Sequence, residues 1–138
     1  MPPLNHAVLS ASSAYRWLEC PPSALATADI PDKTTIYAQE GSAAHEMAEY
    51  KIRWHLGEKD LAPPNIGNFN AEEIDRYTDS YAYYTTDKIE TIRKICPDAI
   101  VMVEQRLDFS NYVKDGFGTG DLVIVADDVL QVIDFKYG

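Results

Sequence analysis

Two apolar runs separated by a pair of aspartates constrain the fold of this chain more than any other feature. The runs read LVIVA at 122–126 and VLQVI at 129–133, with Asp127-Asp128 between them. β-Branched residues favour extended strands, and adjacent aspartates favour a tight turn. The pattern therefore predicts a β-hairpin with strands over 121–126 and 129–136. The high apolar content indicates that both strands are buried.

The register of this hairpin brings two carboxylates together. A two-residue or four-residue turn pairs Ala126 with Val129 and therefore Asp121 with Asp134, whereas a three- or five-residue turn breaks this pairing. Directly opposed Cβ atoms lie about 4.5–5.5 Å apart, and like charges there are destabilising. A divalent cation between the carboxylates removes the repulsion, and hard oxygen ligands suit Mg²⁺ or Mn²⁺. We therefore expect Asp121 and Asp134 to bind Mg²⁺ or Mn²⁺.

Lys136 extends this candidate site. Side chains alternate along a strand, so Lys136 projects to the same face as Asp134. An ammonium group there can orient a water molecule and offset charge that develops on a phosphate oxygen. The alternative is a surface hairpin whose charges are merely solvated, as most charges are. The strongly apolar flanks of the two strands favour the catalytic interpretation.

Three stretches before the hairpin have helical patterns with recognisable ends: 10–18, 42–56 and 70–96. The first begins after a serine cap and ends before Pro21-Pro22, and the second is stopped by Gly57. The third opens with a capping box formed by Asn70 and Glu73. Along it Ile74, Tyr77, Tyr81, Tyr84, Ile92 and Ile95 keep helical spacing, which we interpret as a core stripe.

A further strand pattern and a glycine-rich loop connect the helices to the hairpin. Residues 100–107 are rich in β-formers at their start, but the alternation weakens after Val103, so Glu104 could face either the site or solvent. Residues 116–120 are expected to form the loop. Helices followed by a meander of three strands predict an α+β fold, with N-terminal helices packed on an antiparallel three-stranded sheet.

His45 lies on the second predicted helix. The apolar stripe of that helix is expected to contain Ala43, Met47, Tyr50 and Trp54. At about 100° per residue, His45 falls between Ile52 and Glu49, at the edge of the stripe. Such a boundary position suits a ligand that points from a helix to a sheet, although a lone helical histidine is more often structural. Glu49, one turn later, is interpreted as a surface residue.

The ordered motifs resemble a known nuclease superfamily. Gly118-Thr119-Gly120-Asp121, followed after the hairpin by Ile133-Asp134-Phe135-Lys136, resembles the two-part signature of the PD-(D/E)XK nucleases. The upstream stretch 40–46, with Gly41 and His45, is similar to the Gly-x-x-x-His helix motif of the RecB-like branch. Residues 10–22 and 105–138 also resemble a phage-associated family of that branch whose function is poorly defined.

This resemblance implies a role for each matched residue. Asp121 and Asp134 would bind the metal ions, with the Phe135 carbonyl as a further ligand. Lys136 would position the attacking water, and His45 would complete the coordination. The implied fold is a partial restriction-endonuclease-like core, and the implied reaction is metal-dependent hydrolysis of phosphodiesters in DNA.

The composition limits the partners that we expect. The net charge is −10 and no basic stripe is present, so affinity for DNA is expected to be weak for this chain alone. No apolar run approaches the roughly 18 residues that a membrane span needs, so no membrane partner is expected. Cys20 and Cys96 lie far apart in no metal-ligand spacing, and the first residues resemble no secretory signal. Both observations favour the cytoplasm.

The resemblance also predicts that part of the core lies outside residues 1–138. In the nucleases, a helix bearing Gln-x-x-x-Tyr and a further strand follow the lysine. We therefore expect residues 1–138 to form a single domain that a longer chain or self-association completes, or a degenerate relic, and to be a poor nuclease alone. The alternatives are a non-catalytic module that binds nucleic acid or protein, and a hydrolase of another phosphoester.

Overall fold

The computed structural model describes residues 6–31 and 33–138, which form two compact units. One unit contains the residues up to Lys33 together with Arg106–Thr119. The other contains Thr34–Gln105 and Gly120–Gly138. Every residue that the sequence assigns to the candidate site lies in the second unit.

Short helices make up the start of the first unit. A 3₁₀ turn, η1 (Ala11–Ser13), leads into α1 (Ala14–Glu19), and α2 (Pro22–Ala26) follows directly. The first helix therefore lies where the sequence predicts it. Pro22 starts a second helix, which was not predicted from the sequence. Proline is tolerated at the first helical position because it removes only an N–H that has no helical partner.

The region expected to be a glycine-rich loop is largely strand. β2 (Phe117–Ala126) includes most of it, so only Gly116 stays outside the strand. A Cβ atom on Gly116 would lie 2.7 Å from the ring of Phe109 and 2.7 Å from the carbonyl oxygen of Val113. Glycine is therefore required at 116 by the close approach of its neighbours.

The helix that carries His45 is longer than predicted. α3 (Ile36–His55) starts at a cap in which the Thr35 hydroxyl accepts a hydrogen bond from the N–H of Ala38. The start near Ser42 that the sequence predicts is wrong, because the helix continues through Gly41 to Ile36. A glycine inside a helix costs only about 1 kcal/mol, which packing readily offsets. The predicted stop is confirmed, because Gly57 has φ +109° just beyond the helix.

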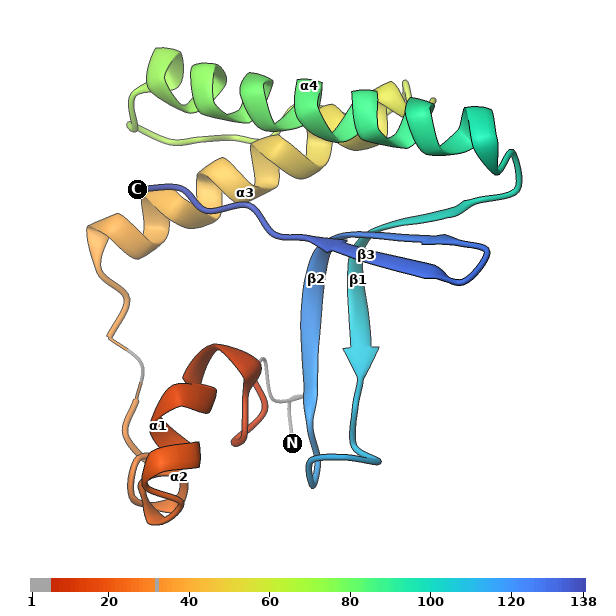
Figure 1. Ribbon diagram of the computed structural model, residues 1–138. Coiled ribbons are helices and arrows are strands. Elements are labelled where there is room, and N and C mark those ends of the chain that lie inside the picture. The colour runs from red at the N-terminus through yellow and green to blue at the C-terminus, as the bar shows by residue number, and fades with distance from the viewer. Residues whose placement is uncertain (1–5, 32) are drawn as a thin grey trace. The chain divides into compact units, whose positions relative to one another are not determined.

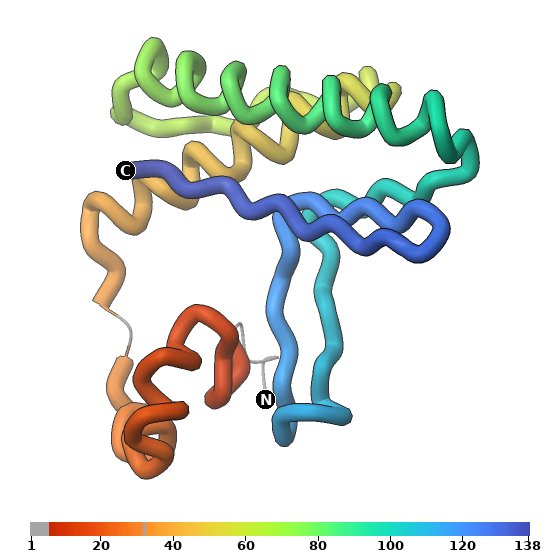
Figure 2. The backbone as a smooth tube through the Cα atoms, viewed as in Figure 1, coloured from red at the N-terminus to blue at the C-terminus, as the bar shows by residue number. Residues whose placement is uncertain are grey.

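α4 (Ala71–Ile95) begins where its sequence signal predicts. The side chain of Asn70 accepts a hydrogen bond from the N–H of Glu73, which confirms the cap. Figures 1 and 2 show that α3 and α4 run in the same direction, and that the segment between them returns along the pair before α4 begins.

The buried face of α4 includes only part of the predicted stripe: Ile74 is fully buried and Tyr81 packs against the core. Tyr77 is 47% exposed and Tyr84 is 55% exposed, whereas Thr78, Thr85 and Thr86 are buried. Each of these threonine hydroxyls donates to the backbone carbonyl four residues earlier. The threonines can therefore occupy the buried face because their only polar group is satisfied within the helix.

The predicted stripe of α3 is also rotated. Its buried residues are Ala43, Ala44, Ala48 and Ile52. Trp54, which the stripe included, is 47% exposed. The small side chains of this face allow α3 to approach its neighbours closely, and they set the rotation that directs the adjacent His45.

Three strands form one sheet in the order β1-β2-β3, with β1 at Ile100–Asp108 and β3 at Val129–Ile133. β2 and β3 are antiparallel, and their paired residues run from Ala126↔Val129 to Leu122↔Ile133. This is the register that the two-residue turn predicts. Asp127 in the turn has φ +48°. Helices and a three-stranded antiparallel sheet confirm the α+β class.

Two buried clusters join the helices to the strands within the second unit. The first contains Ala43, Ala44, Ala48, Ile74 and Phe135. The second contains Ile52, Ile89, Leu122 and Ile124. Tyr81 of α4 packs against both clusters. Burial of each large aliphatic side chain stabilises the fold by about 1.5–3 kcal/mol, so these contacts fix α3 and α4 against β2.

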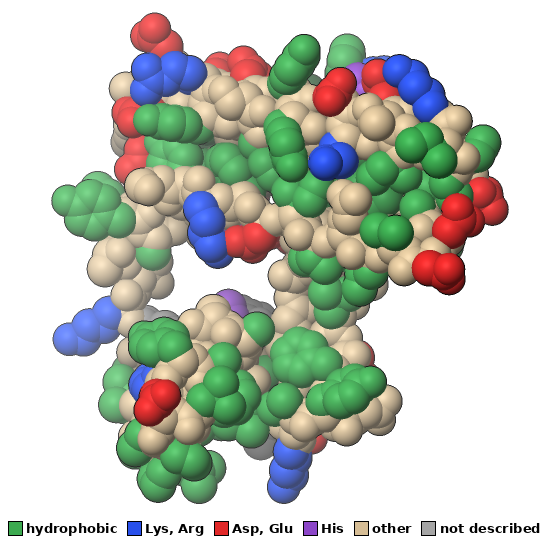
Figure 3. Space-filling model, in the orientation of Figure 1, with side chains coloured by type: hydrophobic (Ala, Val, Ile, Leu, Met, Phe, Trp, Pro, Cys, Tyr) green, Lys and Arg blue, Asp and Glu red, His purple; other side chains and the backbone are tan. Residues whose placement is uncertain are grey.

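The surface carries both signs of charge. On the face drawn in Figure 3, Lys and Arg side chains are scattered among Asp and Glu side chains and form no continuous basic stripe. Among the residues that the structure describes, no helix has the length and apolarity that crossing a membrane requires.

Candidate metal-binding site

Three side chains from three different elements converge within the second unit. His45 of α3, Glu104 of β1 and Asp121 of β2 each offer one ligand atom, and these atoms all lie within 4.8 Å of one another. All three side chains are partly buried. Two carboxylates and an imidazole at this separation form a donor set that suits a divalent cation.

Packing of α3 determines where the His45 ring lies. Ala44 is fully buried in the core. The next residue, His45, lies at the edge of the core, and 36% of the His45 side chain is exposed. The ring contacts Phe135 edge-on, with centroids 5.1 Å apart and an interplanar angle of 66°. Its Nδ1 lies 3.6 Å from Oδ2 of Asp121. The boundary position expected for His45 therefore places it beside Asp121.

Glu104 reaches the site through an irregular point in β1. Its φ is +50°, a left-handed conformation that is rare for residues other than glycine and costs about 1–3 kcal/mol. Arg53 of α3 donates from Nη2 to the carbonyl of Val103 at 3.1 Å and from Nε to Glu49 at 2.7 Å. α3 thus holds the strand next to the irregular residue. The weakened alternation after Val103 is the sequence signal of this irregularity.

A backbone hydrogen bond orients Asp121. The N–H of Phe135 donates to Oδ2 of Asp121 at 2.6 Å, and only 13% of the Asp121 side chain is exposed. This bond forms just beyond the last β2–β3 pair, since Asp121 precedes Leu122 and Phe135 lies two residues after Ile133. The carboxylate is therefore fixed by the chain segment that carries Asp134 and Lys136.

The pKa values of the three residues reflect their mutual charges. Burial would raise the pKa of Asp121, but the neighbouring His45 ring and the hydrogen bond from Phe135 outweigh it, and the pKa is lowered. The Asp121 carboxylate, 3.6 Å from the ring, raises the pKa of His45 above its ordinary value. Burial, followed by repulsion from Asp121, raises the pKa of Glu104. Protonation of Glu104 or a cation beside it would each relieve this repulsion.

Asp134 and Lys136 lie beside this group and pair with each other. Asp134 follows the end of β3, and its Oδ2 lies 2.6 Å from Nζ of Lys136. The Lys136 side chain is 86% exposed, and its hydrogen bond with Asp134 raises its pKa. The Asp134 charge also raises the pKa of His45, so it acts on the site from outside the three-residue group.

Phe135 separates these two charged residues and anchors them. Its side chain is 6% exposed and packs in the first core cluster, while its N–H binds Asp121. The predicted site residues therefore occur together in one region, with Glu104 added to them. The roles of Asp134 and of the Phe135 carbonyl as metal ligands stay predictions.

The hydroxyl group of Tyr81 is buried, and its ring contacts Phe135, whose N–H binds Asp121. The Oη atom of Tyr81 is buried and has no hydrogen-bond partner among the described residues. The Tyr81 ring packs against Phe135 with centroids 4.8 Å apart. An unpartnered buried polar atom is typical of a site that accommodates a further polar group, such as an ion and its water.

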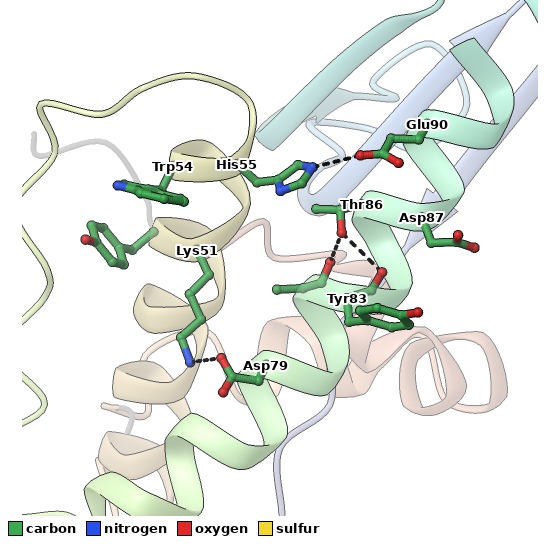
Figure 4. Close-up of a pocket in the computed structure, with 10 residues that line it drawn as sticks. Lys51, Trp54, His55, Asp79, Tyr83, Thr86, Asp87 and Glu90 are labelled. Carbon is green, nitrogen blue, oxygen red and sulfur yellow. Dashed lines mark hydrogen bonds and ion pairs between the residues drawn. The ribbon is translucent and has the colours of Figure 1, made fainter. Parts of the chain in front are cut away.

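A cavity of about 550 Å³ lies between α3 and α4. Figure 4 shows Lys51 of α3 directed at Asp79 of α4, 2.6 Å away, and His55 directed at Glu90, 3.3 Å away. The Lys51 ammonium also donates to the Thr78 hydroxyl at 2.8 Å. These charged groups satisfy one another, so the groove stabilises the helix pair and offers no converging set of free ligands.

The fold and the site together define a small α+β protein with a carboxylate–imidazole centre built from a helix and two strands. The chain belongs to the family described as a protein of unknown function, DUF2800, whose model matches residues 6–138. No solved structure matches the chain.

Proposed function

We propose that this protein is a metal-dependent nuclease that hydrolyses phosphodiester bonds in DNA. The observation that carries the proposal is the convergence of His45, Glu104 and Asp121 beside the Asp134–Lys136 pair. The ordered resemblance to the RecB-like PD-(D/E)XK nucleases supports DNA as the substrate.

Each residue has a chemical task in this proposal. Asp121, Glu104 and His45 would hold Mg²⁺ or Mn²⁺, with Asp134 and the Phe135 carbonyl as the further ligands that the resemblance implies. The bound ion supplies Lewis-acid chemistry, which polarises a phosphoryl oxygen. Since the hydrogen bond from Phe135 already orients Asp121, the cost of arranging this carboxylate is met by folding.

Lys136 is suited to hold a water molecule or a phosphate oxygen. Its ammonium group is protonated at neutral pH, as an ordinary lysine is, and the hydrogen bond with Asp134 raises its pKa further. The side chain is 86% exposed and can reach a substrate that approaches from solvent. Because the neighbouring Phe135 is buried in the core, the backbone of Lys136 is fixed and only its side chain is free to move.

The direct test is cleavage of linear single- and double-stranded DNA with and without Mn²⁺. The wild-type protein should cut only with Mn²⁺, and Asp121→Asn and Lys136→Met should each reduce the rate by about 100-fold or more. Lys94→Met is the control for Lys136, because Lys94 is an exposed lysine on α4. Cleavage that survives Asp121→Asn, or that never depends on Mn²⁺, would contradict the proposal.

The charge of the chain favours a second candidate. With a net charge of −10, the protein gains little from phosphate contacts. A non-catalytic module that retains the metal centre and binds a nucleic acid or protein partner would then explain the same side chains. Mn²⁺ binding without cleavage of any DNA substrate would support this alternative over the nuclease.

A further inference from the structure

The Tyr81 hydroxyl is the polar group of the second unit whose environment is least explained by the fold itself. Oη is buried and unpartnered within the described part of the chain. Buried tyrosine hydroxyls usually find a hydrogen-bond partner, because leaving one unsatisfied destabilises the folded state. Tyr81 packs against both core clusters, so its ring cannot turn out to solvent without loss of packing.

The other buried hydroxyls of α4 show how this helix treats polar groups. Thr78, Thr85 and Thr86 each donate to a carbonyl of the same helix. Tyr81 is too long for such a bond, since its hydroxyl lies at the far end of a ring. Its partner must therefore come from the space beyond the helix, where the ring meets Phe135.

The contact with Phe135 connects Tyr81 to the candidate site, because the N–H of Phe135 binds Asp121. Burial raises the pKa of Tyr81 first, and the carboxylates of Asp121, Asp134 and Glu104 raise it further. These are the acidic residues of the candidate metal site and its neighbour. In the metal-free protein the hydroxyl keeps its proton and can donate a hydrogen bond.

We propose that Tyr81 is a positioning residue of the candidate site, whose hydroxyl donates a hydrogen bond to an oxygen ligand held beside Asp121. The oxygen belongs either to a water molecule or to a phosphate group. This inference rests on the proposed metal-binding function and assigns a task to the one buried α4 hydroxyl that the helix leaves without a partner.

The test compares Tyr81→Phe with Tyr84→Phe, a control on the same helix whose side chain is 55% exposed. Thermal unfolding is measured for the protein alone, with Mn²⁺, and with Mn²⁺ plus thymidine 5′-monophosphate. Alone, Tyr81→Phe should unfold at the wild-type temperature or above it, because the change removes only an unsatisfied hydroxyl. With ligand it should gain less stability than the wild type or Tyr84→Phe.

The two ligand conditions separate the two sources of oxygen. A deficit with Mn²⁺ alone supports a water molecule as the partner, and a deficit that appears only with the nucleotide supports a phosphate oxygen. We expect affinity to fall about tenfold in the affected condition, which corresponds to about 1.4 kcal/mol. Titration of Mn²⁺ by electron paramagnetic resonance at 25 °C measures the same difference without unfolding the protein.

Two other outcomes overturn the inference, and they differ from each other. If Tyr81→Phe loses stability without Mn²⁺ while its gains from Mn²⁺ and nucleotide equal those of the wild type, Tyr81 is a core residue only. If the wild-type protein gains nothing from Mn²⁺ and shows no Mn²⁺ signal change, the proposed metal function fails together with the role of Tyr81.

Discussion

Replacement of Glu104 by Gln should make the metal-free protein more stable and the metal-loaded protein less stable. The ligand atoms of Glu104 and Asp121 lie within 4.8 Å of each other. Two charges at that distance repel by about 3.5 kcal/mol at an effective dielectric constant of about 20, and by about 0.9 kcal/mol in bulk water. Because solvent screens this partly exposed pair, we expect a gain of about 1 kcal/mol.

The gain should depend on pH in a defined direction. The pKa of Glu104 is raised above 4.5 in the folded protein. Its repulsion is therefore absent below about pH 4, where the carboxyl is protonated in both states, and appears as the pH rises through the raised folded value. In thermal unfolding at pH 7.5, Glu104→Gln should gain about 3–5 °C over the wild type, and at pH 4 the two should coincide.

Mn²⁺ should reverse this order. An ion present at about 100 times its dissociation constant stabilises the folded wild type by about 2.7 kcal/mol. Glu104→Gln removes one charged ligand and should lose most of that stabilisation. Glu46→Gln provides the matched control, because Glu46 is an exposed residue of α3 and loses the same charge. A Glu104→Gln variant that is less stable without metal, or that keeps the full response to Mn²⁺, would refute the reasoning.

The remaining predictions concern the backbone and the His45–Asp121 pair. Gly116→Ala should lower the stability by about 1–3 kcal/mol in urea unfolding, because its Cβ would meet the Val113 carbonyl, whereas Gly41→Ala in the interior of α3 has open space and should raise it by about 0.5–1 kcal/mol. The raised pKa of His45 means that metal-free stability from its pairing with Asp121 is complete below about pH 6.5 and declines as the pH rises through the folded value. Asp121→Asn should flatten that decline in melts between pH 6 and pH 8, and an unchanged slope would show that the pair contributes nothing.

The hairpin could be predicted because its information is local. A two-residue turn fixes the pairing of neighbouring residues, and the structure has that pairing as far as Leu122 and Ile133. The ladder then ends, and the Asp121 carboxylate accepts the N–H of Phe135 in place of a further strand pair. The strand pattern gave no signal for this change, because it depends on how Phe135 packs against helices distant in sequence.

Glu104 illustrates what the sequence could not provide. Its left-handed backbone is held from outside the strand, since Arg53 of α3 binds the carbonyl just before it. The weakened alternation in β1 could indicate an irregular backbone after Val103, but not whether the Glu104 side chain faces the site or solvent. Tyr77 and Tyr84 of the predicted α4 stripe are exposed for a related reason. Helical spacing identifies a stripe, but only tertiary packing decides that the smaller Thr78 and Thr85 take the buried positions.

The segment after β3 alternates between core and solvent although no neighbouring strand pairs with it. Phe135 is buried and Tyr137 packs at the edge of the same cluster, while Asp134 and Lys136, on either side of Phe135, are exposed. The packing of Phe135 in the core therefore fixes the positions of Asp134 and Lys136, the residues on either side of it. A substitution there, such as Phe135→Leu, changes the volume of the core and displaces the proposed reactive groups together. At this position a substitution that changes the stability of the fold would also displace the groups of the proposed site, so selection on the one would act on the other.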